Sequence, residues 1–172
     1  MLRLARASLE AAVAGAAPPA PPSDPALSVR HGAFVSLHAE GRLRGCIGQI
    51  ASDDPLGDVV ARMAVAAAQR DPRFPPVAAG ELPGLRVEIS VLGEPVPLDP
   101  RDPAAIAIGR HGVMVRRGEA EALLLPQVAP EHGWTAEDFL AATCRKAGLP
   151  AHAWREPDSE VFVFEADIFG EE

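Results

Sequence analysis

The chain has 172 residues, of which 48% are hydrophobic, and a formal net charge of -8. This length favours one domain, or two small lobes that share a core, and the apolar content is enough to bury an interior. The negative charge disfavours a broad nucleic-acid-binding surface, and no apolar run is long enough to cross a bilayer, so we expect a cytoplasmic protein.

The first residues form an amphipathic pattern. Apolar residues recur at helical spacing from Leu2 to Val13, which predicts an opening helix and not a targeting segment. Gly15 ends this helix, and closely spaced prolines follow in residues 16–28. Because proline cannot continue a helix, we expect this proline-rich link to be stiff and extended.

The hydrophobic period changes to two in the next segment. Residues 33–38 and 42–50 both alternate, and Glu40-Gly41 between them is typical of a turn, so the two segments are expected to form a hairpin. Alternation in the second strand places Arg42, Arg44 and Cys46 on one face. Leu43 and Ile47 would share the other face, unless a bulge at Gly45 reverses the order.

The rest of the chain mixes helices with further strands. A helix is expected from Leu56 to about Ala67, with an aspartate of Asp53-Asp54 as its N-cap, and another follows the capping box that begins at Thr135. Alternating patterns predict strands at residues 85–91, 112–116, 122–125 and 161–169. Together these elements predict an α+β fold with a mainly antiparallel sheet, hairpins and three to four helices.

The most informative motif is Leu43–Gln49, in which Cys46 lies between Gly45 and Gly48. Glycine weakens a strand, so its usual reasons there are a bulge, a bend or the close approach of another group. Arg44 could favour the Cys46 thiolate, and His111 is the best candidate for a base. The alternative is a buried, inert thiol, as small cysteines often are.

Two other segments carry candidate ligand-binding or catalytic groups. Arg73 and Phe74 follow each other in a proline-rich loop, and an arginine beside an aromatic ring can bind an anionic or planar ligand. A hydrophobic plug formed by Phe74 is the structural alternative. Glu88 interrupts an apolar strand, and it either lies on a solvated sheet face or pairs with Arg44 or Arg73.

Metal and cofactor sites have little support in the sequence. The five histidines are scattered, without the close spacing of a zinc site, and no glycine loop fits a phosphate-binding pattern. We therefore predict no metal and no cofactor. Cys144 lies on the apolar stripe of a helix, so packing is its simplest role, and two cysteines without a secretion signal suggest reduced thiols.

Several phrases of the sequence, in order, resemble one known family. They are LRGCIGQI, DPLGDVV, DPRFPPV, ELPGLRVEISVLGEP, IGRHGVMVRRG, ALLLPQVAPEHGW, CRKAGLP and FEADIFGE. They resemble the AMMECR family, whose prokaryotic members are called protein A of the AmmeMemoRadiSam system. The resemblance implies one AMMECR-type domain over residues 1–172, with two interleaved subdomains and a cleft between two lobes. It also implies an association with a Memo-like protein and a radical S-adenosylmethionine protein.

These observations lead to one main functional hypothesis and two rivals. The main hypothesis is an accessory or catalytic component of a small-molecule pathway, with a ligand cleft around the RGCIG motif. Catalytic candidates are Cys46, His111 and Glu88, and ligand-binding candidates are Arg44, Gly45, Gly48, Arg73 and Phe74. The first rival is a non-enzymatic adaptor that docks a partner protein. The second, disfavoured by the charge, is a nucleic-acid-binding regulator.

Overall fold

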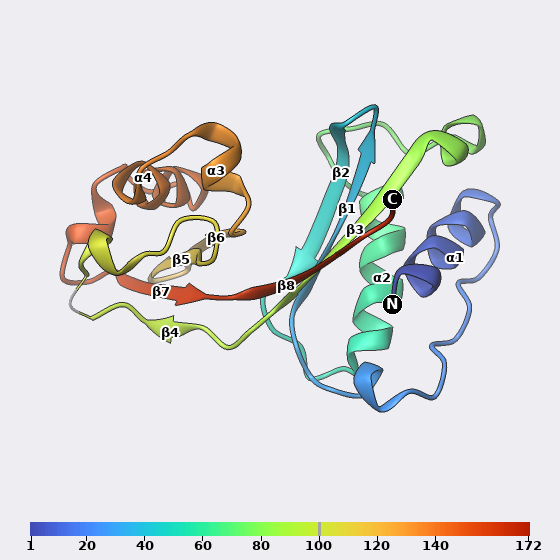
Figure 1. Ribbon diagram of the computed structural model, residues 1–172, viewed down its shortest axis with the longest axis horizontal. Coiled ribbons are helices and arrows are strands. Elements are labelled where there is room, and N and C mark those ends of the chain that lie inside the picture. The colour runs from blue at the N-terminus through green and yellow to red at the C-terminus, as the bar shows by residue number, and fades with distance from the viewer. Residues whose placement is uncertain (100) are drawn as a thin grey trace. The chain divides into compact units, whose positions relative to one another are not determined.

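A computed structural model describes residues 1–99 and 101–172. The chain divides into two compact units, and the first is discontinuous in sequence: unit 1 is Met1–Leu92 with Asp167–Glu172, and unit 2 is Gly93–Ala166. Each unit contains one four-stranded antiparallel sheet with helices (Figure 1). The α+β class and the antiparallel pairing predicted from the sequence are confirmed.

Unit 1 is built on a sheet with the strand order β2-β1-β3-β8. Its elements are α1 (Leu2–Val13), the short 3-10 helix η1 (Pro25–Leu27), β1 (Ala33–Ala39), β2 (Arg42–Gln49), α2 (Leu56–Gln69), the 3-10 helix η2 (Ala79–Gly84), β3 (Leu85–Leu92) and β8 (Ala166–Gly170). Helix α2 packs against β1 and β2, and α1 packs against α2 and β3 (Figure 1). The predicted hairpin is therefore correct, with β1 and β2 antiparallel neighbours.

The core of unit 1 lies between the sheet and its two helices. Alternate residues of β1 and β3 face it, because Val35, Leu37, Val87 and Ile89 are at most 1% exposed and pack with apolar side chains of α1 and α2. The intervening residues of these strands project from the opposite face of the sheet. Ser36 and Glu88 are on that second face.

The proline-rich link is less regular than predicted. Pro25–Leu27 turns into a short 3-10 helix, whose first backbone donors are capped by Asp24, and Leu27 is buried with Leu4 and Ala61. A Cβ on Gly57 of α2 would lie 2.8 Å from Pro21, so the link also packs closely on α2. The expectation of a purely extended link is therefore wrong for its final residues.

Unit 2 has a sheet with the order β4-β7-β5-β6. Its elements are β4 (Val96–Pro97), η3 (Pro103–Ala105), β5 (Gly112–Arg117), β6 (Ala120–Leu124), α3 (Val128–His132), α4 (Ala136–Lys146), η4 (Ala153–Arg155) and β7 (Glu160–Phe164). Helix α4 covers the sheet, and Phe139 and Leu140 are fully buried in a separate core with Val113 and Val115. The predicted capping box is present, since Thr135 and Asp138 exchange hydrogen bonds at the start of α4.

Two sequence-based expectations about boundaries are wrong. Residues 161–169 do not form one strand: β7 belongs to the sheet of unit 2 and β8 to that of unit 1, with Glu165 between them. Alternation continues through this junction, so the pattern could not reveal the change of sheet. At α2 the N-cap residue is Pro55, without a side-chain cap, so neither aspartate of the Asp53-Asp54 pair has the expected role.

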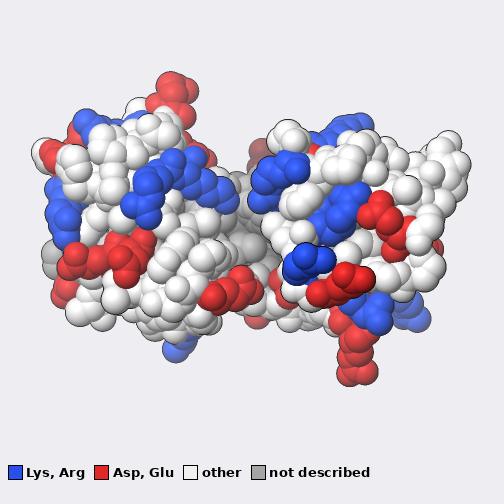
Figure 2. Space-filling model, turned by 90° about the horizontal axis from the view of Figure 1, so that it is seen from above, with Lys and Arg blue, Asp and Glu red and all other residues white. Residues whose placement is uncertain are grey.

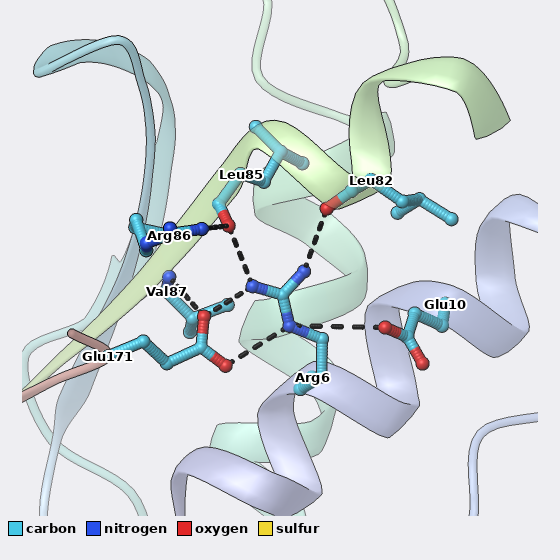
Figure 3. A network of polar contacts seen from close by, with 7 residues as sticks. All are labelled: Arg6, Glu10, Leu82, Leu85, Arg86, Val87 and Glu171. Atoms are coloured by element: carbon cyan, nitrogen blue, oxygen red, sulfur yellow. Dashed lines mark hydrogen bonds and ion pairs between the residues drawn. The ribbon is translucent and has the colours of Figure 1, made fainter.

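The C-terminal segment returns to unit 1 and is held there by Arg6 of α1 (Figure 3). The Arg6 guanidinium donates to both carboxylate oxygens of Glu171 and to the carbonyl oxygens of Leu82 and Leu85. Glu171 also accepts a hydrogen bond from the backbone N–H of Val87 at 2.9 Å. This network links the first helix, the start of β3 and the end of the chain.

Candidate functional site

The Leu43–Gln49 motif forms most of β2, and its register contains a bulge. Leu37 of β1 pairs with Gly45, but the next residue, His38, pairs with Leu43, so Arg44 is an extra residue on β2. The bulge shifts Leu43 into register with the face of β1 that points away from the core, where it is 40% exposed. The predictions that Leu43 shares a face with Ile47, and that Arg42 shares one with Cys46, are therefore wrong.

Cys46 lies beyond the bulge, opposite Ser36. Because the neighbouring residues Val35 and Leu37 face the core, the Ser36–Cys46 pair projects from the other face of the sheet. The Cys46 side chain is half-buried, and Ser36 Oγ lies 3.2 Å from its Sγ, within hydrogen-bonding distance. The thiol is therefore outside the apolar core, unlike the fully buried Cys144 of α4, whose pKa is raised by burial.

Both glycines of the motif have packing reasons. A Cβ on Gly45 would lie 2.3 Å from the backbone oxygen of Ala67, so glycine lets α2 approach β2 closely. A Cβ on Gly48 would lie 2.2 Å from the ring of Phe34, on the neighbouring strand. The space beside both residues is filled by the protein itself, and this explains the unusual glycines without invoking a ligand.

A loop after α2 lies along the outer edge of β2 and binds the Cys46 peptide. The carboxylate of Asp71 accepts the Cys46 backbone N–H at 2.8 Å, and Arg73 donates to the Cys46 carbonyl oxygen at 3.2 Å. Asp71 and Arg73 are themselves joined by two side-chain hydrogen bonds, of 2.9 and 2.7 Å. The loop thereby pairs backbone groups of an edge strand that would otherwise be available to another chain.

Asp71 is held as a carboxylate although it is only 4% exposed. The hydrogen bonds from the Arg73 side chain lower its pKa far below the ordinary value, with help from the backbone N–H groups of Cys46 and Arg73 and against the effect of burial. The pKa of Arg73 is raised in turn, chiefly by its hydrogen bonds to Asp71 and against the effect of burial, with smaller electrostatic contributions from Asp71 and Cys46. Arg73 is therefore held as a cation beside the Cys46 peptide.

Arg44 is fixed by a second carboxylate. Its Nε and Nη2 donate to Glu81 of η2 at 2.8 and 3.0 Å, a bidentate geometry that orients the guanidinium strongly. Glu81 also accepts the backbone N–H of Ala78, and the hydrogen bonds from Arg44 and Ala78 lower its pKa. The bulge residue is therefore held by an ion pair to a segment 37 positions away.

The two guanidinium groups converge on one aromatic ring. The Cζ atoms of Arg44 and Arg73 lie 5.9 and 5.4 Å from the centroid of the Phe74 ring, within the range of cation–π interactions. None of the described hydrogen bonds of either arginine uses Nη1. We define the hairpin site as Arg44, Cys46, Asp71, Arg73 and Phe74.

The other candidate catalytic residues have different positions. Glu88 lies on β3, directly opposite Ser36 on the face that also carries Cys46. His111 belongs to unit 2, where its Nδ1 accepts the backbone N–H of Ala107 at 3.2 Å. Within unit 1, the structure therefore brings together four residues predicted as site residues, Arg44, Cys46, Arg73 and Phe74. Glu88 lies two strands from Cys46 on the same face of the sheet.

Sequence reasoning missed three residues that build this site. Asp71, Glu81 and Ser36 each contact a predicted site residue. Asp71 was visible as the first residue of the Asp-Pro-Arg-Phe loop, and a buried aspartate before an arginine could have been suspected of holding it. Ser36 and Glu81 gave no signal, because their contacts depend on strand register and on the fold of η2.

Charge is mixed around both units. Figure 2 shows acidic and basic side chains interspersed on the visible face of each unit, without an extended field of one sign there. Among residues 1–99 and 101–172, no group of three or more His, Cys, Asp or Glu side chains is placed to hold a metal ion. No helix of this described part of the chain is long and apolar enough to span a membrane.

Comparisons with known proteins give one consistent family. The sequence model described as AMMECR1 matches residues 2–169. A protein of Methanothermobacter thermautotrophicus is 49% identical over 83% of this chain and 77% of its own length. A protein of Thermococcus gammatolerans is 44% identical and is aligned over 100% of this chain and 89% of its own length.

A solved structure has the same fold. The crystal structure of an uncharacterized protein from Pyrococcus horikoshii superposes with a TM-score of 0.95 at 41% sequence identity. The alignment covers 99% of this chain and 89% of that chain. The similarity therefore extends over both units and is not limited to the hairpin motif.

Proposed function

Because the chain belongs to the AMMECR1 family, we propose that it is an accessory or catalytic component of a small-molecule pathway that binds an anionic ligand at the hairpin site. The carrying observation is the convergence of Arg44 and Arg73 on Phe74 beside Cys46. The resemblance to AmmeMemoRadiSam protein A further suggests that it works with a Memo-like protein and a radical S-adenosylmethionine protein. Two cysteines without a secretion signal favour the cytoplasm as the place where it works.

The ligand chemistry follows from the fixed guanidinium groups. Each arginine is oriented by its own carboxylate, and the Nη1 group of each takes no part in that pairing. Oriented guanidinium groups suit carboxylate and phosphate oxygens, and the Phe74 ring suits a planar part of the ligand. A ligand held this way would lie next to a thiol outside the core, so Cys46 is its reactive neighbour.

Two alkylating reagents that differ mainly in charge can test this proposal. The quantity to measure is the ratio of the reaction rate with anionic iodoacetate to the rate with neutral iodoacetamide. We expect this ratio to be higher for Cys46 than for a small unstructured thiol. Arg44→Gln should lower this rate ratio by about threefold or more, because it removes a positive charge near the thiol. Rates would be followed by mass spectrometry of the peptide that contains Cys46, so that Cys144 does not contribute.

The matched control is Arg62→Gln, which removes an arginine from the exposed surface of α2. It should leave the ratio unchanged. A wild-type ratio equal to that of the small thiol, with no effect of Arg44→Gln, would refute anion binding at the hairpin site.

A protein-docking role is the second candidate, because the bulge exposes an apolar side chain. Leu43 is 40% exposed beside Arg44, on an edge strand. If the protein is an adaptor, Leu43→Ser or Phe74→Ala should abolish its capture of a Memo-like partner in a pull-down. The ratio of the iodoacetate rate to the iodoacetamide rate at Cys46 should then equal that of the small thiol. Loss of the anion preference in Arg44→Gln with capture intact would favour the ligand-binding role.

A further inference from the structure

Three polar side chains form one row across the sheet of unit 1. Ser36 of β1 lies directly opposite Cys46 of β2 and directly opposite Glu88 of β3. Directly opposed residues of antiparallel strands project from the same face, with Cβ atoms about 5 Å apart. Ser36 is only 6% exposed and its Oγ lies 3.2 Å from Cys46 Sγ. The residue between Glu88 and Cys46 in this row is therefore a shielded serine, whose hydroxyl contacts the thiol.

We propose that Glu88 accepts the proton of the Cys46 thiol through the Ser36 hydroxyl when Cys46 acts on the ligand of the hairpin site. This role rests on the proposed function, because that function gives the thiol a task. In the step, the S–H bond of Cys46 breaks and its proton passes to Ser36 Oγ, while the Ser36 hydroxyl proton passes to the Glu88 carboxylate. The products are a thiolate, a regenerated hydroxyl and a neutral carboxylic acid, so protons and charge balance.

A hydroxyl group suits this position because it donates one hydrogen bond and accepts two. In the structure Ser36 Oγ donates to Cys46 Sγ, which is the arrangement expected after the transfer. Before the transfer the hydroxyl is rotated, so that the thiol donates to Ser36 and Ser36 donates to Glu88. After the transfer, protonated Glu88 donates to Ser36 and Ser36 donates to the thiolate. Neither arrangement leaves a member of the row without a partner, so Ser36 can serve both protonation states without moving the backbone.

Charged and titratable groups lie on several sides of the row. Arg44 and Arg73 lie on the side of Cys46, and each is paired with a carboxylate there, Arg44 with Glu81 and Arg73 with Asp71. The neighbouring row on the same face carries the titratable pair His38 and Arg86, which are directly opposed. On the other side, the row formed by Gly48, Phe34 and Ser90 carries no charge. Asp167 on β8 is the remaining acidic strand residue next to β3.

The pH dependence of Cys46 alkylation by iodoacetamide tests the relay in the full chain. The reagent forms the Sγ–C bond and releases iodide, so its rate reports the thiolate. We expect Ser36→Ala and Glu88→Gln each to slow alkylation at pH 7 by about tenfold or more and to move the pH midpoint of the reaction upward. The double variant should be no slower than the slower single variant, because either change breaks the same relay.

Two control variants separate the relay from general effects. Ser90→Ala removes another buried hydroxyl from the same sheet, and Glu10→Gln removes a carboxylate from the exposed side of α1. Neither should change the alkylation profile. Thermal unfolding of all variants would identify any loss of rate that comes from loss of structure.

The sign of the Glu88→Gln effect decides the question. Without a relay, removing a negative charge near the thiol stabilises the thiolate and makes alkylation faster. Faster or unchanged alkylation in Glu88→Gln would therefore overturn the proposal, as would strictly additive effects of the two changes. The reagent-charge ratio is a separate readout, so anion binding can fail while the relay holds, or the reverse.

Discussion

Asp71 has the most constrained environment of any single side chain in the hairpin site. Its nearly inaccessible carboxylate accepts hydrogen bonds from the Cys46 backbone, the Arg73 backbone and the Arg73 side chain. Removing a buried acceptor leaves its donors without partners, which costs more than the bonds themselves contribute. Asp71 therefore links the stability of unit 1 to the geometry around Cys46.

We expect Asp71→Asn to lower the free energy of unfolding by about 2 kcal/mol at pH 7, since an amide cannot accept from all these donors. The pKa of Asp71 is depressed in the folded chain. Its contribution is therefore complete above the unfolded-state pKa of about 4 and is lost as the pH falls toward the depressed folded-state value.

Urea unfolding at several pH values measures this contribution. The difference between wild type and Asp71→Asn should shrink steadily below about pH 4. The exposed residue Asp158 offers a matched control, and Asp158→Asn should have little effect at any pH. A difference that stays constant down to pH 2 would contradict the assigned role of the Asp71 carboxylate.

Gly45 tests the packing explanation for the motif. A methyl group there would collide with the Ala67 backbone oxygen at 2.3 Å, so α2 or β2 would have to move. We expect Gly45→Ala to cost about 3 kcal/mol or more in the free energy of unfolding. Gly84→Ala is the control, because a Cβ on Gly84 meets no atom within 4 Å. Equal stabilities of the two variants would mean that the glycine serves something other than helix packing.

At the level of secondary-structure elements, β8 depends on contacts outside its own strand. Its residues are mostly exposed, and Ile168 and Phe169 are 44% and 39% accessible. The Arg6–Glu171 network holds the residues that follow β8 against β3 (Figure 3). Burial alone would raise the pKa of Glu171, but hydrogen bonds from Arg6 and Val87 and the charges of Arg6 and Arg86 lower it overall.

Glu171→Gln should therefore loosen the C-terminal segment at neutral pH. We expect faster amide hydrogen exchange in β8, by about tenfold, with little change in α2 or in unit 2. The neighbouring variant Glu172→Gln provides a control of equal charge. Because the pKa of Glu171 is depressed, amide exchange in β8 of the wild type should approach that of Glu171→Gln as the pH falls below about 4. Unchanged exchange in β8 would show that strand pairing alone holds it.

The elements also show what the sequence could and could not predict. Period-two and helical patterns located β1, β2, β3, α1, α2 and α4, and each of these except β2 has one largely buried face. The alternation left open whether a bulge at Gly45 reverses the faces of β2, and the structure has the extra residue at Arg44. The sequence does not show that residues 161–169 are divided between two sheets, because the alternation of apolar and polar residues continues through both strands. Arg44, Arg73 and Phe74 could be proposed as ligand-binding residues from their types, whereas the contact of Ser36 with Cys46 depends on the strand register.

At the level of the whole molecule, unit 2 is one continuous segment and unit 1 is not. Unit 2 has its own sheet, its own covering helix and a separate core around Phe139 and Leu140. Unit 1 needs both ends of the chain to complete its four strands. The two units should therefore differ in how they tolerate separation.

We expect residues 93–166 alone to unfold cooperatively on heating, although a segment of this size is marginally stable. Residues 1–92 alone should be less stable than unit 1 in the full chain, because β8 and Glu171 are missing. Adding a peptide of residues 166–172 should restore part of that stability. Differential scanning calorimetry would reveal both effects, and the lack of a transition for residues 93–166 would contradict the independence of unit 2.

The discontinuity of unit 1 has a consequence for the order of events during synthesis. A ribosome completes β1, β2, β3 and all of unit 2 before it releases the strand that closes the first sheet. Domains tend to fold as they emerge, so unit 2 can reach its structure while the first-made half is still open at the β3 edge. Arg6 of α1 meets Glu171 only after all of unit 2 has been translated. The open edge of β3 in the nascent chain is therefore covered late. Until β8 pairs with it, this edge is the surface most exposed to pairing with another chain.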